Sequence, residues 1–391
     1  MKIDLNYPMN STSKEQFRAL FPHTKTDHIY LNHAAISPLS ADVTQALKSF
    51  NEDRNSGTVE NFESWMETVD VTRNLIADFI HTDSPERITF MGNTSDAISA
   101  IAEGLLWKKG DEIILNSMEF PSNVQPFRIL ERFGVKVIYL KPDEQGRITP
   151  EQIDEAISRK TRLVSISAVQ YLNGFRADLK SIGKICRRRN VLFVVDGIQA
   201  LGAVDVDVTA CNIDALATGA HKWLMAPMGI GFLYISEVME KQLSPAKTGW
   251  LSVEVPWDLK NFNQPWLPVS EHLETGTLNI AGIIGLNTAL KNFMAIGIEH
   301  VESNILSLID DAIAFLRNHP KVIIITPADA ADHAGIISFS VNGMDSPDNF
   351  VKSLSHKKIT ISAREGFIRI SPHYYNTTDE IETVLDRVLE S

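Results

Sequence analysis

The chain has 391 residues, a net charge of −12 and an ordinary globular composition, 44% hydrophobic and 22% charged. Two domains are expected, because a single hydrophobic core rarely grows beyond about 250–300 residues. We expect no nucleic-acid partner, since duplex binding requires positive charge to displace condensed counterions. No run approaches the ~20 apolar residues that span a bilayer. The first residues lack the apolar core of a signal peptide, so we expect no membrane partner and a cytoplasmic location.

Short apolar runs alternate with helical stretches between about residues 86 and 234. Most runs are continuously apolar, which is typical of parallel strands buried on both faces. The alternation predicts an α/β domain with a mainly parallel sheet flanked by helices. The seven expected strands are RITFM (87–91), EIILNS (112–117), KVIYL (136–140), RLVSISA (162–168), VLFVVD (191–196), IDALAT (213–218) and GIGFLY (229–234).

The pattern changes after residue 280. An amphipathic stripe predicts a long helix over 300–318, ended by Pro320. Thr377 and Glu380 form a capping box that opens the last helix. We expect a large domain over 26–280 and a smaller α+β domain over 281–391, with residues 1–25 packing against the latter. The small domain is expected to hold strands near 322–326, 335–341, 359–363 and 367–371 and a helix near 347–356.

Polar residues gather where the expected strands end, and ligands of open parallel sheets bind outside the carboxyl ends of the strands. These ends supply one acid, one lysine, one stackable aromatic ring, amides, and hydroxyls at a helix start. A phosphorylated aromatic aldehyde needs that set of groups. The residues are Asn93-Thr94-Ser95-Asp96, Glu119 to Asn123, Gln170, Asp196, Gln199, and Thr218 to Lys222.

Several motifs together resemble the class V aminotransferase family of fold-type I pyridoxal-phosphate enzymes. The densest are VVDGIQALG (194–202) and ATGAHKWLMAPMGIGFLY (217–234), and the resemblance runs from YLNHAAISPLS (30–40) to IRISPHYYNT (368–377). The family includes cysteine desulfurases, selenocysteine lyases, isopenicillin-N-epimerase-like proteins and, more distantly, kynureninases. The resemblance implies the fold-type I architecture and pyridoxal 5'-phosphate as cofactor.

By this resemblance Lys222 is the lysine that forms the Schiff base. A loop lysine is usually a surface residue, but Trp223, Leu224 and Met225 indicate an apolar setting that would lower its pKa. Asp196 ends an apolar strand, where an unpaired carboxylate is costly. The resemblance pairs it with the pyridine nitrogen of the cofactor, although a structural acid is the alternative.

The resemblance assigns the remaining cofactor contacts. Thr94 and Ser95 begin a helix whose free N–H groups suit a phosphate, although an ordinary N-cap has the same geometry. His221 is another expected phosphate contact. Phe120 would stack on the cofactor ring, with a core residue as the alternative. Gln199 would meet the phenolic oxygen, and Gln170 either that oxygen or the substrate carboxylate.

Four residues are expected on the substrate side, and one at a subunit boundary. Arg369 lies in FIRIS (367–371), and a guanidinium there is expected to bind the α-carboxylate of an amino-acid substrate. Arg364 is expected to hold a second acidic group or a structural ion pair. Asn32 and His33 are expected to line the substrate side. Thr277 matches the family residue that reaches the phosphate of the other subunit, which implies a homodimer.

The expected function is a transaminase or lyase, with an amino-acid epimerase as the alternative because EFPSN (119–123) resembles that branch. Cysteine desulfurases carry a catalytic cysteine on a loop that corresponds to 362–367, and this stretch has none, so a desulfurase is disfavoured. The two cysteines of the chain, Cys186 and Cys211, are interpreted as packing thiols. A dinucleotide-binding oxidoreductase would need a G-x-G-x-x-G turn, which GNTSDA (92–97) does not supply. A non-catalytic binding protein would be expected to lack Lys222 or Asp196.

Overall fold

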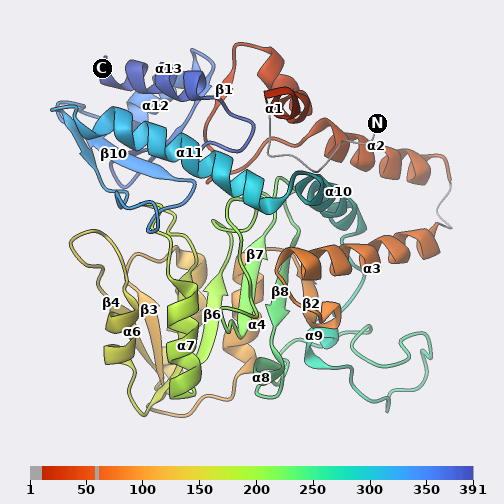
Figure 1. The fold of residues 1–391 in the computed structure, drawn as a ribbon. Coiled ribbons are helices and arrows are strands. Elements are labelled where there is room, and N and C mark those ends of the chain that lie inside the picture. The colour runs from red at the N-terminus through yellow and green to blue at the C-terminus, as the bar shows by residue number, and fades with distance from the viewer. Residues whose placement is uncertain (1–10, 58–60, 391) are drawn as a thin grey trace.

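The large sheet of the protein has seven strands, as the computed structural model, which describes residues 11–57 and 61–390, shows (Figure 1). Their order is β2-β8-β7-β6-β5-β3-β4, and β8 runs antiparallel to both neighbours while the other pairs are parallel. The predicted fold class and all seven predicted strands are confirmed. The strands are β2 (Ile88–Met91), β3 (Glu112–Asn116), β4 (Lys136–Leu140), β5 (Thr161–Ser167), β6 (Leu192–Asp196), β7 (Ala215–Gly219) and β8 (Gly231–Ile235).

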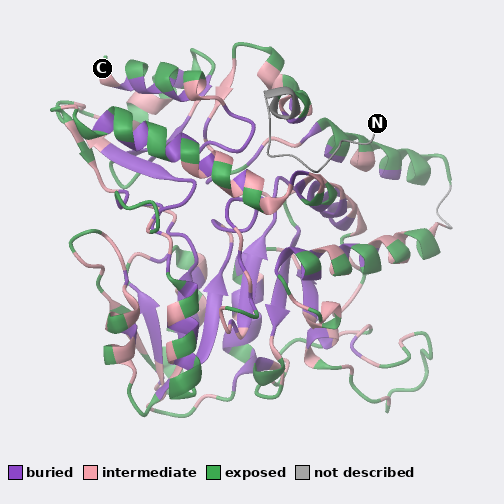
Figure 2. Ribbon diagram, in the orientation of Figure 1, coloured by how far each residue is buried: buried purple, intermediate pink, exposed green. Residues whose placement is uncertain are grey.

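Both faces of this sheet are covered, which explains why its strands are continuously apolar. Val195 packs in one hydrophobic cluster with α3 (Phe62–Phe79), α7 (Leu179–Arg189) and α10 (Ile280–Ile296). The preceding residue, Val194, packs in a second cluster, because successive side chains of a strand point to opposite faces. Helices α4 (Thr94–Gly104) and α5 (Gln125–Arg128) belong to that second cluster. Figure 2 shows the resulting buried sheet between partly exposed helices.

The C-terminal part forms a second, antiparallel sheet of order β12-β13-β10-β9 with its own hydrophobic cluster. The run expected at 359–363 is two strands, because β11 pairs with β1 whereas β12 pairs with β13. The elements are β1 (Ile29–Tyr30), β9 (Val322–Ile324), β10 (Ile337–Val341), β11 (Ile359–Thr360), β12 (Ser362–Arg364), β13 (Phe367–Ile370), α11 (Ile298–Arg317), α12 (Pro347–Ser355) and α13 (Thr378–Leu389).

Helix α11 joins the two parts of the molecule. Its first half places Val301 and Ile305 in a cluster of the large sheet, and its second half places Leu308 and Leu316 in the cluster of the small one.

The predicted capping box opens α13, where the Thr377 side chain accepts from the backbone of Glu380 and the Glu380 side chain accepts from the backbone of Thr377. Apart from α1 (Ser11–Arg18), the remaining helices are α2 (Ala41–Asn55), α6 (Pro150–Ala156), α8 (Glu237–Glu240), α9 (Val269–His272) and the 3-10 turns at Pro22–Lys25, Pro85–Arg87, Pro121–Asn123 and Ile129–Phe133.

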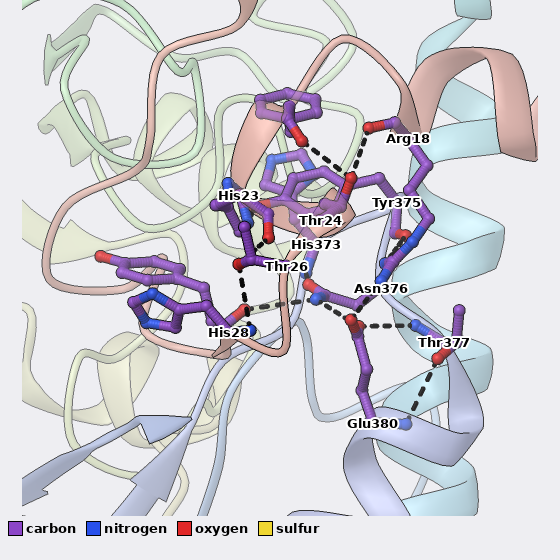
Figure 3. Close-up of polar contacts among 12 residues, drawn as sticks. Arg18, His23, Thr24, Thr26, His28, His373, Tyr375, Asn376, Thr377 and Glu380 are labelled. Atoms are coloured by element: carbon purple, nitrogen blue, oxygen red, sulfur yellow. Dashed lines mark hydrogen bonds and ion pairs between the residues drawn. The ribbon is translucent and has the colours of Figure 1, made fainter. Parts of the chain in front are cut away.

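The N-terminal segment lies against the start of α13, as Figure 3 shows. Arg18, which ends α1 (Ser11–Arg18), forms an ion pair with Glu380 and donates to the carbonyl of Tyr375 at 3.0 Å. Phe21 stacks on the Tyr375 ring with centroids 4.1 Å apart. Residues 1–10, which we expected to pack with the small domain, lie outside the described residues.

Within the described part of the chain, no single helix combines the length and the apolar composition needed to cross a membrane. The bent pair α10 and α11, at 81° to each other, passes that test only when both helices are taken together.

Candidate active site

A pocket of about 390 Å³ opens at the carboxyl ends of the parallel strands, and we call it the Lys222 pocket. The first turn of α4 borders it, and so do the loops that follow β3, β5, β6 and β7 and the strands β12 and β13. The side chains of eight predicted site residues therefore meet here. Its lining residues are Ala34, Ala35, Asn93, Thr94, Ser95, Phe120, Ser122, Tyr171, Ile198, Gln199, His221, Lys222, Arg364 and Arg369.

Lys222 follows β7 in a tight turn, in which Met225 donates its N–H to the Lys222 carbonyl at 2.9 Å. Its Nζ lies 5.6 Å from the centre of the Phe120 ring. Burial lowers the pKa of Lys222 to about 8, the charge of Asp196 opposes this shift, and Arg369 and Arg364 add to it. A usable fraction of free amine is therefore present near neutral pH.

Asp196 ends β6 and is 1% exposed. It accepts hydrogen bonds from the Ile198 N–H at 3.0 Å and from Ser122 Oγ at 3.4 Å. Burial raises the pKa of Asp196 to about 6, and the charge of Lys222 counters this. Asp196 does not itself line the Lys222 pocket, and no cationic side chain of the described residues lies within ion-pair distance of its carboxylate, so this buried acid lacks a counter-ion.

The first turn of α4 has the features of an anion site. The Asn93 side chain caps the N–H of Asp96 at 2.9 Å, which leaves the N–H groups of Thr94 and Ser95 to other acceptors. Thr94 Oγ1 is buried and has no hydrogen-bond partner in the described protein. Burial and the nearby Lys222 charge lower the pKa of His221, so this ring is neutral at pH 7.

Arg369 is 2% exposed and has no acidic partner among the described residues. Its Nε donates to Ser362 Oγ at 3.1 Å and one terminal nitrogen donates to the Tyr171 carbonyl at 2.7 Å. Burial and the neighbouring Arg364 lower the pKa of Arg369 to about 9. Arg364 is exposed at the pocket rim. Two guanidinium groups that form no ion pair within the described part of the chain lie in one pocket, which suits an anionic substrate group.

Two predicted cofactor residues already have partners in the protein. Gln199 lines the pocket, and its amide donates to the Ala34 carbonyl at 3.0 Å and accepts from the Trp223 indole at 2.8 Å. Gln170 does not line the pocket, and its Nε2 donates to Glu119 at 2.8 Å.

Three further predicted residues lie away from the pocket lining. His33 is fully buried, where Nδ1 donates to the Ser371 carbonyl and Nε2 accepts from the Tyr375 hydroxyl, both at 2.8 Å. Asn32 forms a bridge to Ser371, and its buried Oδ1 has no partner in the described protein. Thr277 is exposed in a separate hollow of about 350 Å³, the Thr277 hollow, which Gly92, Asp96 and Lys247 also line.

Three residues around the site received no role from the sequence, although Glu119 and Ser122 belong to the strand-end stretch 119–123 that the sequence indicated. Ser122 contacts Asp196, Tyr171 lines the pocket with its ring 5.2 Å from that of Phe120, and Glu119 lies buried behind both. All three follow strand ends, but a position at a strand end does not by itself assign a role. Their roles depend on contacts between two loops, and a strand-by-strand reading does not show such contacts.

Comparisons with known proteins agree with this geometry. The family model for aminotransferase class-V matches residues 29–384. A probable cysteine desulfurase of Methanothermobacter thermautotrophicus is 32% identical over 93% of this chain and 94% of its own length. The Bacillus subtilis aminotransferase YcbU is 26% identical over 96% and 97%. The solved cysteine desulfurase of Thermococcus onnurineus superposes with a TM-score of 0.87 at 27% identity, over 96% of this chain and 97% of its own.

The chain belongs to the aminotransferase class-V family, as its motifs predicted. It is a pyridoxal-phosphate-dependent enzyme of fold-type I. The relatives give the epimerase alternative no support, and their names keep open the desulfurase reaction that the sequence disfavoured.

Proposed function

We propose that this enzyme is a lyase that removes a group from the side chain of an α-amino acid, with Lys222 as its catalytic base. The observation that carries the amino-acid substrate is Arg369, a buried guanidinium in the same pocket as Lys222 that has no acidic partner among the residues the structure describes. A substrate carboxylate would supply the missing counter-charge through two parallel hydrogen bonds. The lyase reaction is supported by the relatives that are named cysteine desulfurases.

The residues of the pocket fit pyridoxal phosphate. Lys222 would hold the aldehyde carbon, Asp196 would keep the ring nitrogen protonated, and the start of α4 with Thr94 and His221 would bind the phosphate. When bound, the cofactor supplies an electron sink for the bond that breaks at the substrate α-carbon. Phe120 is 44% exposed toward the pocket, and its ring is free to stack.

Arg369 and Lys222 would have different roles in the reaction. Arg369 fixes the carboxylate and so directs the α-hydrogen of the substrate toward Lys222. The free amine of Lys222 takes that proton, and its pKa near 8 lets it hold or return the proton at neutral pH. As the bond from the β-carbon to the leaving group breaks, its electrons go to the leaving group. Hydrolysis releases the remainder as a keto acid and ammonia.

The leaving group would depart without a cysteine of the enzyme. Cys186 packs in the hydrophobic core behind the sheet, and Cys211 lines a different hollow. The turn between β12 and β13 is only Glu365-Gly366. If cysteine is the substrate, its sulfur would therefore leave as sulfide.

Transamination is the second candidate, since a relative over nearly the whole chain is named an aminotransferase. The test is to mix the holoenzyme with single amino acids, including cysteine, and to identify the products. A keto acid with stoichiometric ammonia supports the lyase. Conversion of the cofactor to its amine form without ammonia supports transamination. No spectral change with any α-amino acid would refute the proposal.

We also propose that the enzyme is a homodimer in which Thr277 contributes to the site of the other subunit. Thr277 is exposed, and in its own subunit it lies in the Thr277 hollow rather than in the Lys222 pocket. The first turn of α4 lies between the Thr277 hollow and the Lys222 pocket of the same subunit, so Thr277 lies outside its own site and would need a second copy to contribute to one. A cytoplasmic location stays a prediction.

A further inference from the structure

Glu119 is a buried carboxylate that accepts three hydrogen bonds and has no cationic partner among the described residues. It follows β3 and is 7% exposed. Its Oε1 accepts from the Ser167 N–H and from Gln170 Nε2, both at 2.8 Å, and its Oε2 accepts from the Ser167 hydroxyl. Ser167 is the last residue of the neighbouring strand β5, and Gln170 lies in the loop that follows this strand. We call these contacts the Glu119 cross-link.

The Glu119 cross-link ties together the two loops that form one wall of the Lys222 pocket. On the first loop Phe120 follows Glu119 directly, and Ser122 reaches Asp196. On the second loop Tyr171 follows Gln170 directly, and its carbonyl holds Arg369 at 2.7 Å. The Phe120 and Tyr171 rings meet edge to face at 5.2 Å.

Packing alone does not account for a carboxylate at this place. Burial raises the pKa of Glu119 to about 7 against the pull of the Ser167 donors, and the charge of Asp196 adds to the rise. The charged side chain is therefore costly here, and an apolar residue of equal size would avoid that cost. An apolar residue would not join the two loops.

We propose that Glu119 is a positioning residue, whose bonds to Ser167 and Gln170 hold Phe120 and Tyr171 as one fixed wall for the cofactor ring. Glu119 itself does not line the pocket. It acts through the two neighbouring aromatic residues. The inference rests on the cofactor site assigned above.

The test uses holoenzyme variants and two properties of the bound cofactor. One is its visible circular dichroism per bound molecule, which an achiral ring acquires only from fixed asymmetric surroundings. The other is its dissociation constant. Glu119→Leu removes the Glu119 cross-link at nearly constant size, and we expect the dichroism to fall severalfold and the dissociation constant to rise by about tenfold or more.

Glu119→Gln separates position from charge. Its carbonyl can accept from Ser167 N–H and Gln170, and its amide can donate to the Ser167 hydroxyl, so the Glu119 cross-link survives without the charge. We expect this variant to keep both properties within about twofold of wild type. Losses as large as those of Glu119→Leu would overturn the positioning role.

Asp214→Leu is the matched control. Asp214 is also a partly buried carboxylate that accepts from a backbone N–H, Phe193 at 2.9 Å, and a serine hydroxyl, Ser236 at 3.0 Å. It lies at the opposite ends of β6 and β7, away from the pocket. We expect both cofactor properties to be unchanged. If Asp214→Leu matched Glu119→Leu, the losses would reflect general destabilisation and the proposal would fail.

If Glu119→Leu does not fold, Gln170→Met takes its place in the test, because this change removes only the hydrogen bond from Gln170 to Glu119. A smaller loss in the same direction supports the proposal, and unchanged dichroism and affinity refute it. A wild-type protein that bound no cofactor would instead refute the site itself, so the two failures are distinguishable.

Discussion

Lys222, which lines the pocket, and Asp196, which is buried at the end of β6, carry opposite charges, and burial disfavours the charged form of both. Burial lowers the pKa of Lys222 to about 8 and raises that of Asp196 to about 6, and each charge offsets part of the shift of the other. Without cofactor, both groups are largely charged only between about pH 6 and pH 8. Two consequences of these values are measurable.

Capture of the cofactor by Lys222 should depend on pH, because only the unprotonated amine attacks an aldehyde. With a pKa near 8, the capture rate of the apoprotein should rise roughly fivefold between pH 7 and pH 8 and level off above about pH 9. Borohydride trapping followed by mass spectrometry of the Lys222 peptide measures it. A label on another lysine, or a rate that still rises steeply above pH 9, would contradict the assignment.

Asp196 should destabilise the apoprotein as pH rises. Its folded pKa is raised from 3.8 to about 6, so its stabilising contribution is complete below 3.8 and is lost as pH rises through 6. Asp196→Asn lacks this titration. The variant should therefore gain stability relative to wild type between pH 4 and pH 7, by up to about 3 kcal/mol, while turnover of its holoenzyme falls severely. Thermal unfolding of both proteins across that range measures the difference in stability. A difference that shrinks as pH rises would have the opposite sign and would refute the raised pKa of Asp196.

At the scale of elements, the turn that carries Lys222 is held from two sides. The His373 ring donates to the Trp223 carbonyl at 3.0 Å, and Gln199 accepts from the Trp223 indole. Gly202, in the turn after β6, has φ +94°, and a Cβ there would lie 2.3 Å from the Trp223 carbonyl oxygen. This backbone contact leaves no room for a side chain.

Gly202→Ala should therefore displace the Lys222 turn as well as strain its own backbone. We expect a loss of stability well above 1 kcal/mol, about the cost of a positive φ alone, together with slower cofactor capture by Lys222. Gly110→Ala is the control, since Gly110 has φ +93° and a Cβ would meet nothing within 4 Å. Equal losses of stability and capture in both variants would show that only backbone strain is at work.

The strands were predictable from the sequence, whereas their directions and cross-loop contacts were not. A strand buried on both faces is apolar in either direction, so the sequence of β8 does not show that it runs antiparallel. Lys222 and Asp196 could be located because both stand at strand ends. The place of His33 could not, since its partners Ser371 and Tyr375 lie some 340 residues away along the chain.

For the whole molecule, the main unexplained surface is residues 250–266, which we call the aromatic arm. It forms much of the long irregular loop between α8 and α9 that extends from the body at the lower right of Figure 1. Trp257, Phe262 and Trp266 are 68%, 91% and 62% exposed. Apolar groups so exposed usually mark an interface, and the proposed second subunit would cover them.

Replacing Trp257 and Phe262 together by serine should shift the enzyme from dimer to monomer in light scattering. The same change should weaken cofactor binding, because Thr277 would no longer reach a second site. A variant that stayed dimeric would remove the aromatic arm from the interface.

The composite site has its own test, in which two defective variants are mixed. Lys222→Ala cannot attach the cofactor, and Thr277→Ala should bind its phosphate weakly. If Thr277 serves the other subunit, each mixed dimer combines both defects in one site and leaves its second site intact, so random exchange should restore about a quarter of the wild-type sites. If Thr277 instead serves its own subunit, every site in the mixture keeps one defect and exchange restores nothing.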